Sequence, residues 1–98
     1  MARVVVANQA KRDLRSIFSD LNERAGYRVA ARYAADFKAT YRRLTDFPAS
    51  GPPRPALGPK TRIAIVLPNI VIYDHEDGAV TVLRVLHDKR NITRHLIR

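Results

Sequence analysis

Residues 79–98 read AVTVLRVLHDKRNITRHLIR and divide into two unlike halves. Residues 79–87 are mostly β-branched or apolar, which is typical of a buried strand. The residues that follow are polar and cationic, and Asp88 is the only acid among all twenty. We therefore expect the working surface of the molecule to lie beside the end of this strand.

Two shorter apolar runs precede this stretch and complete a sheet. Residues 62–67 and 70–74 read RIAIVL and IVIYD, and Pro68-Asn69 forms the turn between them. A second turn covers residues 75–78 and ends in Asp77-Gly78, a pair favoured in tight hairpins. Because short connections join antiparallel neighbours, these runs and residues 79–87 predict three antiparallel strands.

The first half of the chain predicts one strand and two helices. Residues 3–7, RVVVA, are a short β-branched run, and Asn8 suits the N-cap of the helix that follows. Apolar residues recur at helical spacing over 9–24 and again over 27–46, with Gly26 between them. Two amphipathic helices with so short a join predict an αα-hairpin whose apolar faces share the sheet as a partner.

Residues 47–60 connect the second helix to the sheet. They read FPASGPPRPALGPK and hold five of the six prolines and two of the four glycines. Such a stretch can serve as an SH3-type ligand, but here it joins two regular elements of one small domain and predicts a rigid surface loop. The predicted fold is therefore α+β, with an N-terminal strand, an αα-hairpin and three antiparallel strands in one sheet with the helices on one face.

Length and composition predict one basic domain over residues 1–98. The chain has 18 Lys plus Arg against 9 Asp plus Glu, a formal charge of +9. Such a field attracts nucleic acid, anionic lipid or an acidic protein, and the simpler alternative is a basic protein with no such partner. Because 14 of the cations are arginine, whose planar fork suits phosphate and carboxylate, the composition favours an interaction surface.

Several classes of protein are excluded or disfavoured. The absence of cysteine excludes disulfides and zinc–thiolate sites. No apolar run reaches the ~20 residues of a membrane span, and the N-terminal one is too short for a secretory signal. The sequence thus predicts a cytoplasmic protein without membrane association. For the tail, residues 91–98, two alternatives stay open: it is flexible alone and ordered only on a partner, or it is ordered by itself.

Strand alternation places two arginines. In residues 62–67 the isoleucines share the more apolar face, and Arg62 lies on the other. In residues 79–87 Arg84 alternates with Val80 and Val82. If the helices cover the face of Ile63, we expect Arg62 and Arg84 to point together onto the open face. A single bulge would invert this arrangement.

These residues suggest a cationic site with two alternative uses. Lys60, Arg62, Arg84, His87 and Arg90 resemble the groups that cleave RNA, with the imidazole as general acid or base and the arginines stabilising charge on phosphorus. The acids available as a second partner all lie in turns or at strand ends: Asp74, Glu76, Asp77 and Asp88. In the alternative interpretation His87 only ends its strand through a backbone contact. No histidine spacing forms a metal site, no glycine-rich phosphate loop is present, and no cofactor is predicted.

The order of elements and four motifs resemble the RelE/ParE superfamily of type II toxin–antitoxin toxins, and ParE more closely. The motifs are A-x-x-D-L-x-x-I (10–17), F-P-x-x-G-x-x-R-P-x-L-G (47–58), I-V-I-Y (70–73) and V-L-R-V-L-H-x-x-R (82–90). The resemblance covers nearly the whole chain, and its last motif is the most specific.

The resemblance implies a toxin that inhibits DNA gyrase and replication and is neutralised by a cognate antitoxin in a hetero-oligomeric complex. An acidic antitoxin segment that folds on binding would suit the basic surface. The expected target-binding residues are Lys60, Arg62, Arg84, His87, Lys89, Arg90 and Arg94. A RelE-like, ribosome-dependent mRNA endoribonuclease is the first alternative, with Arg62, Arg84 and His87 as catalytic residues. A basic nucleic-acid-binding module is the second.

Overall fold

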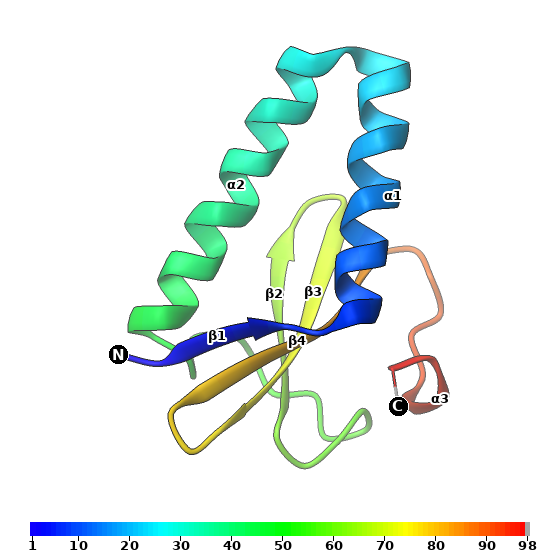
Figure 1. Ribbon diagram of the computed structural model, residues 1–98. Coiled ribbons are helices and arrows are strands. Elements are labelled where there is room, and N and C mark those ends of the chain that lie inside the picture. Colours follow the sequence, from blue (N-terminus) through cyan, green and yellow to red (C-terminus); the bar gives the residue numbers. More distant parts are fainter. Residues whose placement is uncertain (98) are drawn as a thin grey trace.

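The chain folds into two layers, a four-stranded sheet and a helical hairpin on one of its faces (Figure 1). The computed structural model describes residues 1–97. The elements in order are β1 (Arg3–Val6), α1 (Asn8–Ala25), α2 (Tyr27–Asp46), β2 (Thr61–Val66), β3 (Asn69–Glu76), β4 (Ala79–His87) and α3 (Arg94–Ile97). This order confirms the predicted α+β fold, and α3 is a short helix that the sequence patterns did not predict.

The sheet is mixed, with the strand order β1-β4-β3-β2. The helical hairpin carries the chain across the sheet, so β1 pairs with β4 in parallel, whereas β2, β3 and β4 are joined by short turns and pair antiparallel. Asp77 and Gly78 both have positive φ, 50° and 71°, as the predicted hairpin turn requires. Asn69 pairs with His87, which places the β2–β3 turn beside the end of β4.

The first helix begins one residue earlier than its sequence predicts. Asn8 is the first helical residue, and Ala7 occupies the N-cap position without a side-chain cap. The reason is that Ala7 still belongs to the edge of the sheet: its backbone N–H donates to the Val82 carbonyl at 2.9 Å. The chain therefore enters α1 directly from the strand, and the prediction of Asn8 as N-cap is wrong. Gly26, with φ of 89°, joins the two helices as expected.

The main core lies between the hairpin and the sheet. Val71, Tyr73, Val80, Val82 and Val85 are fully or almost fully buried on the sheet side of this core. The helices contribute a chain of edge-to-face aromatic contacts in which the ring centroids of Phe18, Tyr33 and Phe37 lie 5.0–6.4 Å apart. Such contacts add about 0.5–1.5 kcal/mol each to the burial of the rings.

The hairpin extends well beyond the sheet (Figure 1). Its fully buried residues lie towards the sheet, Ala10 in α1 and Phe37, Thr40 and Leu44 in α2. Nearer the tip, Leu21 of α1 is only half buried and Val29 of α2 is 44% exposed. The sheet thus covers one half of the hairpin and leaves the inner face of the other half open.

Tyr41 carries a buried hydroxyl with no hydrogen-bond partner among the described residues. Burial raises the pKa of Tyr41 to about 12. We expect Tyr41→Phe to keep the free energy of unfolding or raise it by about 1 kcal/mol, because it removes an unsatisfied polar group. A raised folded-state pKa also means that the wild type loses stability as pH rises from about 10 towards 12, so the variant should resist alkaline unfolding better. Urea titrations at pH 7 and pH 11 test both points, and a clear loss at pH 7 would reveal a bonded hydroxyl.

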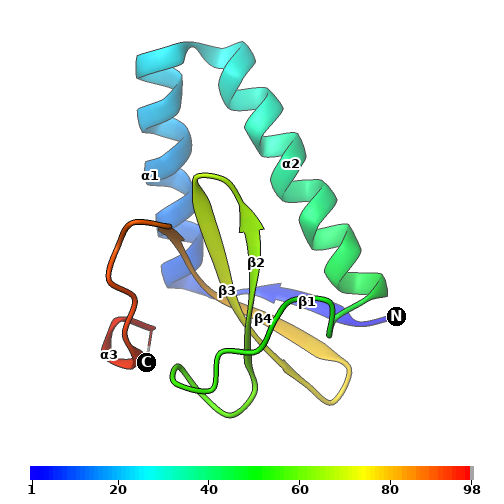
Figure 2. The same cartoon turned by 180° about the vertical axis from the view of Figure 1, so that it is seen from behind.

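The second face of the sheet is not open. Leu57, Ile63, Ile72 and Leu86 form a smaller core there, and Ile70, Ile92, Leu96 and Ile97 pack around it. Figure 2 shows the loop that follows α2 and the C-terminal segment on this side of the sheet, away from the helices. Because Ile63 belongs to this smaller core, the helices cover the face of Ala64 and Val66 instead. The condition on which the two strand arginines were placed, helices over the Ile63 face, is therefore not met.

A bulge in β4 separates the two strand arginines. Ile72 pairs with Arg84 but Tyr73 pairs with Val82, so Leu83 is an extra residue in β4. Arg84 therefore shares the face of Ile72, whereas Arg62 pairs with Tyr73 on the face that the helices cover. The prediction that Arg62 and Arg84 point together onto one open face is therefore wrong. One inserted residue reverses the alternation of side chains between the two faces, and a period-two pattern in the sequence cannot reveal it.

Candidate functional site

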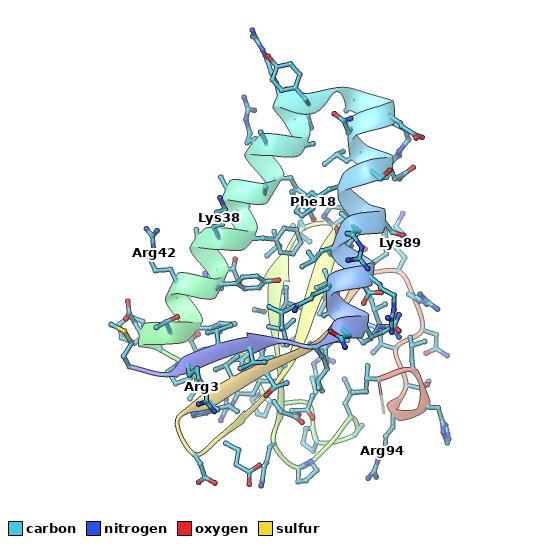
Figure 3. The ribbon with its side chains drawn as sticks, viewed as in Figure 1. Arg3, Phe18, Lys38, Arg42, Lys89 and Arg94 are labelled. Atoms are coloured by element: carbon cyan, nitrogen blue, oxygen red, sulfur yellow. The ribbon has the colours of Figure 1, made fainter. Side chains whose placement is uncertain are left out.

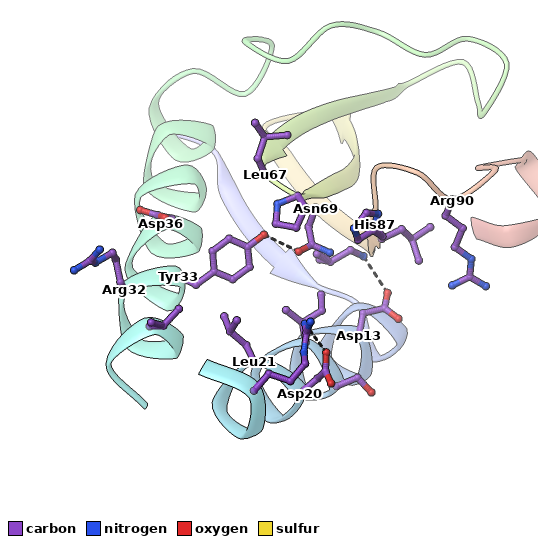
Figure 4. Close-up of a pocket in the computed structure, with 17 residues that line it drawn as sticks. Asp13, Asp20, Leu21, Arg32, Tyr33, Asp36, Leu67, Asn69, His87 and Arg90 are labelled. Atoms are coloured by element: carbon purple, nitrogen blue, oxygen red, sulfur yellow. Dashed lines mark hydrogen bonds and ion pairs between the residues drawn. The ribbon is translucent and has the colours of Figure 1, made fainter. Parts of the chain in front are cut away.

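A groove of about 720 Å³ lies between the tip half of the hairpin and the end of the sheet (Figure 4). Its lining includes Asp13, Ile17, Leu21 and Arg24 from α1, Val29, Arg32, Tyr33 and Asp36 from α2, and Leu67, Asn69, His87 and Arg90 from the sheet end. Val29 and Leu67 are 44% and 68% exposed. The groove thus combines exposed apolar side chains with charged groups of both signs.

Tyr33 fastens α2 to the β2–β3 turn at the back of the groove. Its hydroxyl donates to the Val66 carbonyl oxygen at 2.5 Å and lies 2.6 Å from Oδ1 of Asn69 (Figure 4). The pKa of Tyr33 is raised, mainly by burial, and the hydroxyl keeps its proton at neutral pH. These contacts hold the wall of the groove in place before any partner arrives.

A buried ion pair ties α1 to β4 at the other side of the groove. Nε and Nη2 of Arg84 donate to the two carboxylate oxygens of Asp13 at 2.8 and 3.1 Å, and the Val85 N–H donates to the same carboxylate at 3.0 Å. Nη1 of Arg84 donates to the Leu96 carbonyl at 2.7 Å. The pKa of Arg84 is raised, mainly by its hydrogen bond with Asp13. Arg84 therefore joins α1, β4 and α3, and each of its three nitrogens already donates one hydrogen bond.

Lys60 and Arg62 lie away from the groove. Lys60 forms an ion pair with Glu76 at the end of the β2–β3 hairpin opposite to His87. Nη1 of Arg62 donates to the carbonyls of Ala49 and Gly51 at 3.1 and 2.8 Å, and so holds the loop after α2. The structure therefore does not bring Lys60 and Arg62 together with Arg84 and His87.

The remaining predicted site residues lie at the end of β4 and beyond it. His87 and Arg90 line the groove, and Lys89 and Arg94 are exposed on the segment that follows. Nδ1 of His87 accepts the Lys89 N–H at 3.1 Å, which is the backbone contact of the simpler interpretation of this histidine. Residue 98, the last cation of the tail, lies outside the described residues.

Asp13 and Tyr33 are structural supports of the groove to which the sequence patterns assigned no role at a site. Asp13 lies between Ala10, Leu14 and Ile17 of the apolar stripe, inside the first motif. An acid at the border of such a stripe is a signal for a buried partner, since a lone carboxylate there would be costly. Nothing in the sequence identifies that partner as Arg84.

Two kinds of feature are absent from the described residues. No group of three or more His, Cys, Asp or Glu side chains among residues 1–97 is arranged to hold a metal ion. None of the described helices has the length and apolar character needed to cross a membrane.

Comparison with known proteins gives the family. Residues 4–92 match the family model of the ParE toxin of the type II toxin-antitoxin system, parDE. The chain belongs to the ParE toxin family. Toxin ParE3 and Toxin ParE1 of Caulobacter vibrioides are each 31% identical to it, over 98% and 93% of this chain and 96% and 94% of their own length. These matches confirm the family resemblance seen in the motifs.

The fold agrees with this assignment. A solved chain of the chromosomal ParDE TA system from P. aeruginosa has a TM-score of 0.74 and 19% identity, and the match covers 89% of this chain and 96% of that one. This chain is thus a ParE-type toxin of a type II toxin–antitoxin system, and its family implies an antitoxin as partner.

Proposed function

We propose that this ParE-type toxin inhibits DNA gyrase in the cytoplasm and thereby stops replication, and that its cognate antitoxin neutralises it by occupying the groove. Family membership supports the first part. The groove supports the second part, because it is a preformed concave surface whose lining includes the exposed apolar side chains Val29 and Leu67.

The charges around the groove favour an acidic occupant. Asp13 is engaged by Arg84, and Asp20 by Arg24 at 2.8 Å. Arg32 and Arg90 remain without an ion pair within residues 1–97, beside His87 and the acid Asp36. An amphipathic segment fits this pattern when it places apolar residues on Val29 and Leu67 and carboxylates near the two arginines. The proposed binding site of the acidic antitoxin segment is thus the groove, and not the whole basic surface.

The state of the strand arginines favours gyrase over RNA cleavage. A catalytic arginine needs free donors aimed at the phosphate, yet Arg84 already bonds Asp13 and Leu96. Arg62 bonds two loop carbonyls and shares no face with Arg84. Within the described residues the three groups of the nuclease hypothesis therefore do not converge on one phosphate. Of the predicted target-binding residues, Lys89, Arg90 and Arg94 are exposed cations without an ion pair within the described residues.

A gyrase supercoiling assay beside a ribosome-bound mRNA cleavage assay tests this function. We expect the purified toxin to abolish supercoiling and leave mRNA intact, and the co-expressed antitoxin to restore supercoiling. Leu67→Glu should still inhibit gyrase but require at least about 30-fold more antitoxin, the loss typical of one contact at the centre of an interface. Cuts positioned by codon together with normal supercoiling would replace gyrase by the ribosome as the target.

Ile65→Glu is the matched control for the groove. Ile65 lies in β2, two positions before Leu67, and is exposed to a similar degree, 55% against 68%, but it does not line the groove. Its substitution should leave both inhibition and neutralisation unchanged. If Ile65→Glu weakens the antitoxin as much as Leu67→Glu does, the antitoxin binds along β2 and not in the groove.

A further inference from the structure

The outward face of α2 carries a row of free cations, which we call the α2 stripe. Its members are Arg28, Lys38 and Arg42, all exposed and without an ion pair or side-chain hydrogen bond within the described residues. Lys38 and Arg42 point away from the body of the protein (Figure 3). At 1.5 Å per residue the stripe spans about 21 Å. Arg32, on the border with the groove, adds a fourth cation.

The stripe is not explained by the stability of the helix. Lys38 and Arg42 are spaced i,i+4, as are Arg28 and Arg32, and like charges at this spacing cost about 0.2–0.5 kcal/mol per pair. The acids of α2 lie elsewhere: Asp36 lines the groove, and Asp46 ends the helix. A helix surface selected for stability alone would interleave the two signs.

The residues between the cations indicate what kind of partner fits. Ala31, Ala35 and Ala39 lie between them on the same face and are exposed. Small side chains let a partner approach closely, but they offer no aromatic anchor of the kind that dominates protein interfaces. The one exposed aromatic of α2, Tyr27, lies at the first position of the helix and is 71% exposed. A single ring offers no row of platforms on which successive single-stranded bases stack.

A membrane surface fits less well than a nucleic-acid duplex. A helix that binds a membrane inserts its apolar face, and the apolar face of α2 already packs on the sheet through Phe37 and Leu44. A duplex needs no insertion, because cations on a straight element contact successive phosphates from outside. We propose that the α2 stripe docks on the phosphate backbone of a nucleic-acid duplex. This contact goes beyond gyrase inhibition and needs neither gyrase nor antitoxin.

The test measures binding of the purified toxin to a fluorescent 20-base-pair duplex by anisotropy between 50 and 200 mM salt. The variant replaces Arg28, Lys38 and Arg42 by glutamine, which keeps helix propensity. We expect it to bind at least about 30-fold more weakly at 50 mM salt, and its log–log salt slope to be shallower by about 2.7, the value for three phosphate contacts. Circular dichroism checks that the variant folds. The same titration with a DNA duplex and with an RNA duplex shows which of the two the toxin binds more tightly.

A charge-matched control distinguishes binding through the α2 stripe from attraction by the overall positive charge of the protein. Arg3, Lys11 and Arg54 are exposed cations outside α2, and their replacement by glutamine removes the same charge. This control should lose less than about threefold in affinity if the stripe makes the contacts. An equal loss in both variants, or no duplex binding by the wild type at 50 mM salt, would overturn the proposal. So would a stripe variant that loses binding to polyglutamate or to anionic vesicles but keeps its affinity for the duplex.

Discussion

Replacing Asp13 by alanine is expected to lower the free energy of unfolding by about 4 kcal/mol. Asp13 and Arg84 are only 11% and 12% exposed at their side chains, so removal of Asp13 leaves the charge of Arg84 largely buried with only the Leu96 carbonyl as partner. The same change deprives the Val85 N–H of its acceptor. Urea unfolding at pH 7 measures the effect. Asp13→Asn keeps an oxygen for one donor and should therefore cost less than Asp13→Ala.

Asp20→Ala is the matched control on the same helix. Asp20 pairs with Arg24 at 2.8 Å, the same distance as the shortest Asp13–Arg84 contact, but the two side chains are 61% and 71% exposed. An exposed i,i+4 pair contributes about 0.3–0.5 kcal/mol. If both alanine variants lose the same small amount, the Asp13–Arg84 pair is solvated in solution and does not hold α1 against β4. The raised pKa of Arg84 keeps its charge constant over the pH range of such assays, so the effect should not vary with the protonation of this arginine.

The elements that local patterns specify were predictable. The helix over Tyr27–Asp46 and the strand over Ala79–His87 have the bounds that their apolar periodicity predicts. Asp77-Gly78 forms the expected turn because its positive φ angles are a local requirement of the backbone. The family motifs were equally readable, since they depend on residue identity at fixed spacing.

The functional geometry was not predictable, because it depends on events that leave no local trace. The extra residue Leu83 in β4 decides the side on which Arg84 lies, and its neighbours show no glycine or proline that would announce a bulge. The partner of Arg84 is 71 positions away in sequence, in a helix that the alternation of β4 cannot locate. A cluster of cations in a basic sequence therefore predicted a shared site, although the fold separates Lys60 and Arg62 from His87.

The groove, too, could not be predicted from the sequence, because the helical pattern does not give the extent of the sheet. An apolar stripe predicts that a helix packs on something, but not how far its partner extends. Here the sheet ends before the hairpin does, and Ile17 and Leu21 stay half buried at the mouth of the groove. The apolar surface that a monomer leaves open is where a partner gains most by binding, so the length difference between hairpin and sheet is itself a functional feature.

The loop that follows α2 depends on one glycine. The hydroxyl of Tyr73 donates to the Pro48 carbonyl at 2.9 Å and accepts the Gly51 N–H at 3.1 Å, so this buried side chain holds the loop from below. Gly51 is buried against β2. A methyl group on Gly51 would lie 2.0 Å from the Ile63 carbonyl oxygen and 2.7 Å from the Tyr73 hydroxyl. The third residue after proline in the family motif is thus a glycine for steric reasons.

We therefore expect Gly51→Ala to lower the free energy of unfolding by about 3 kcal/mol, the upper range for overpacking of a buried site. Ser50→Ala, at the exposed neighbouring position, should change it by less than about 0.5 kcal/mol. Adding Tyr73→Phe to Gly51→Ala should not restore stability, because the closer obstacle is the backbone oxygen of Ile63 in β2 and cannot rotate away. Rescue by Tyr73→Phe would locate the clash at the hydroxyl and show that the loop can move off the strand.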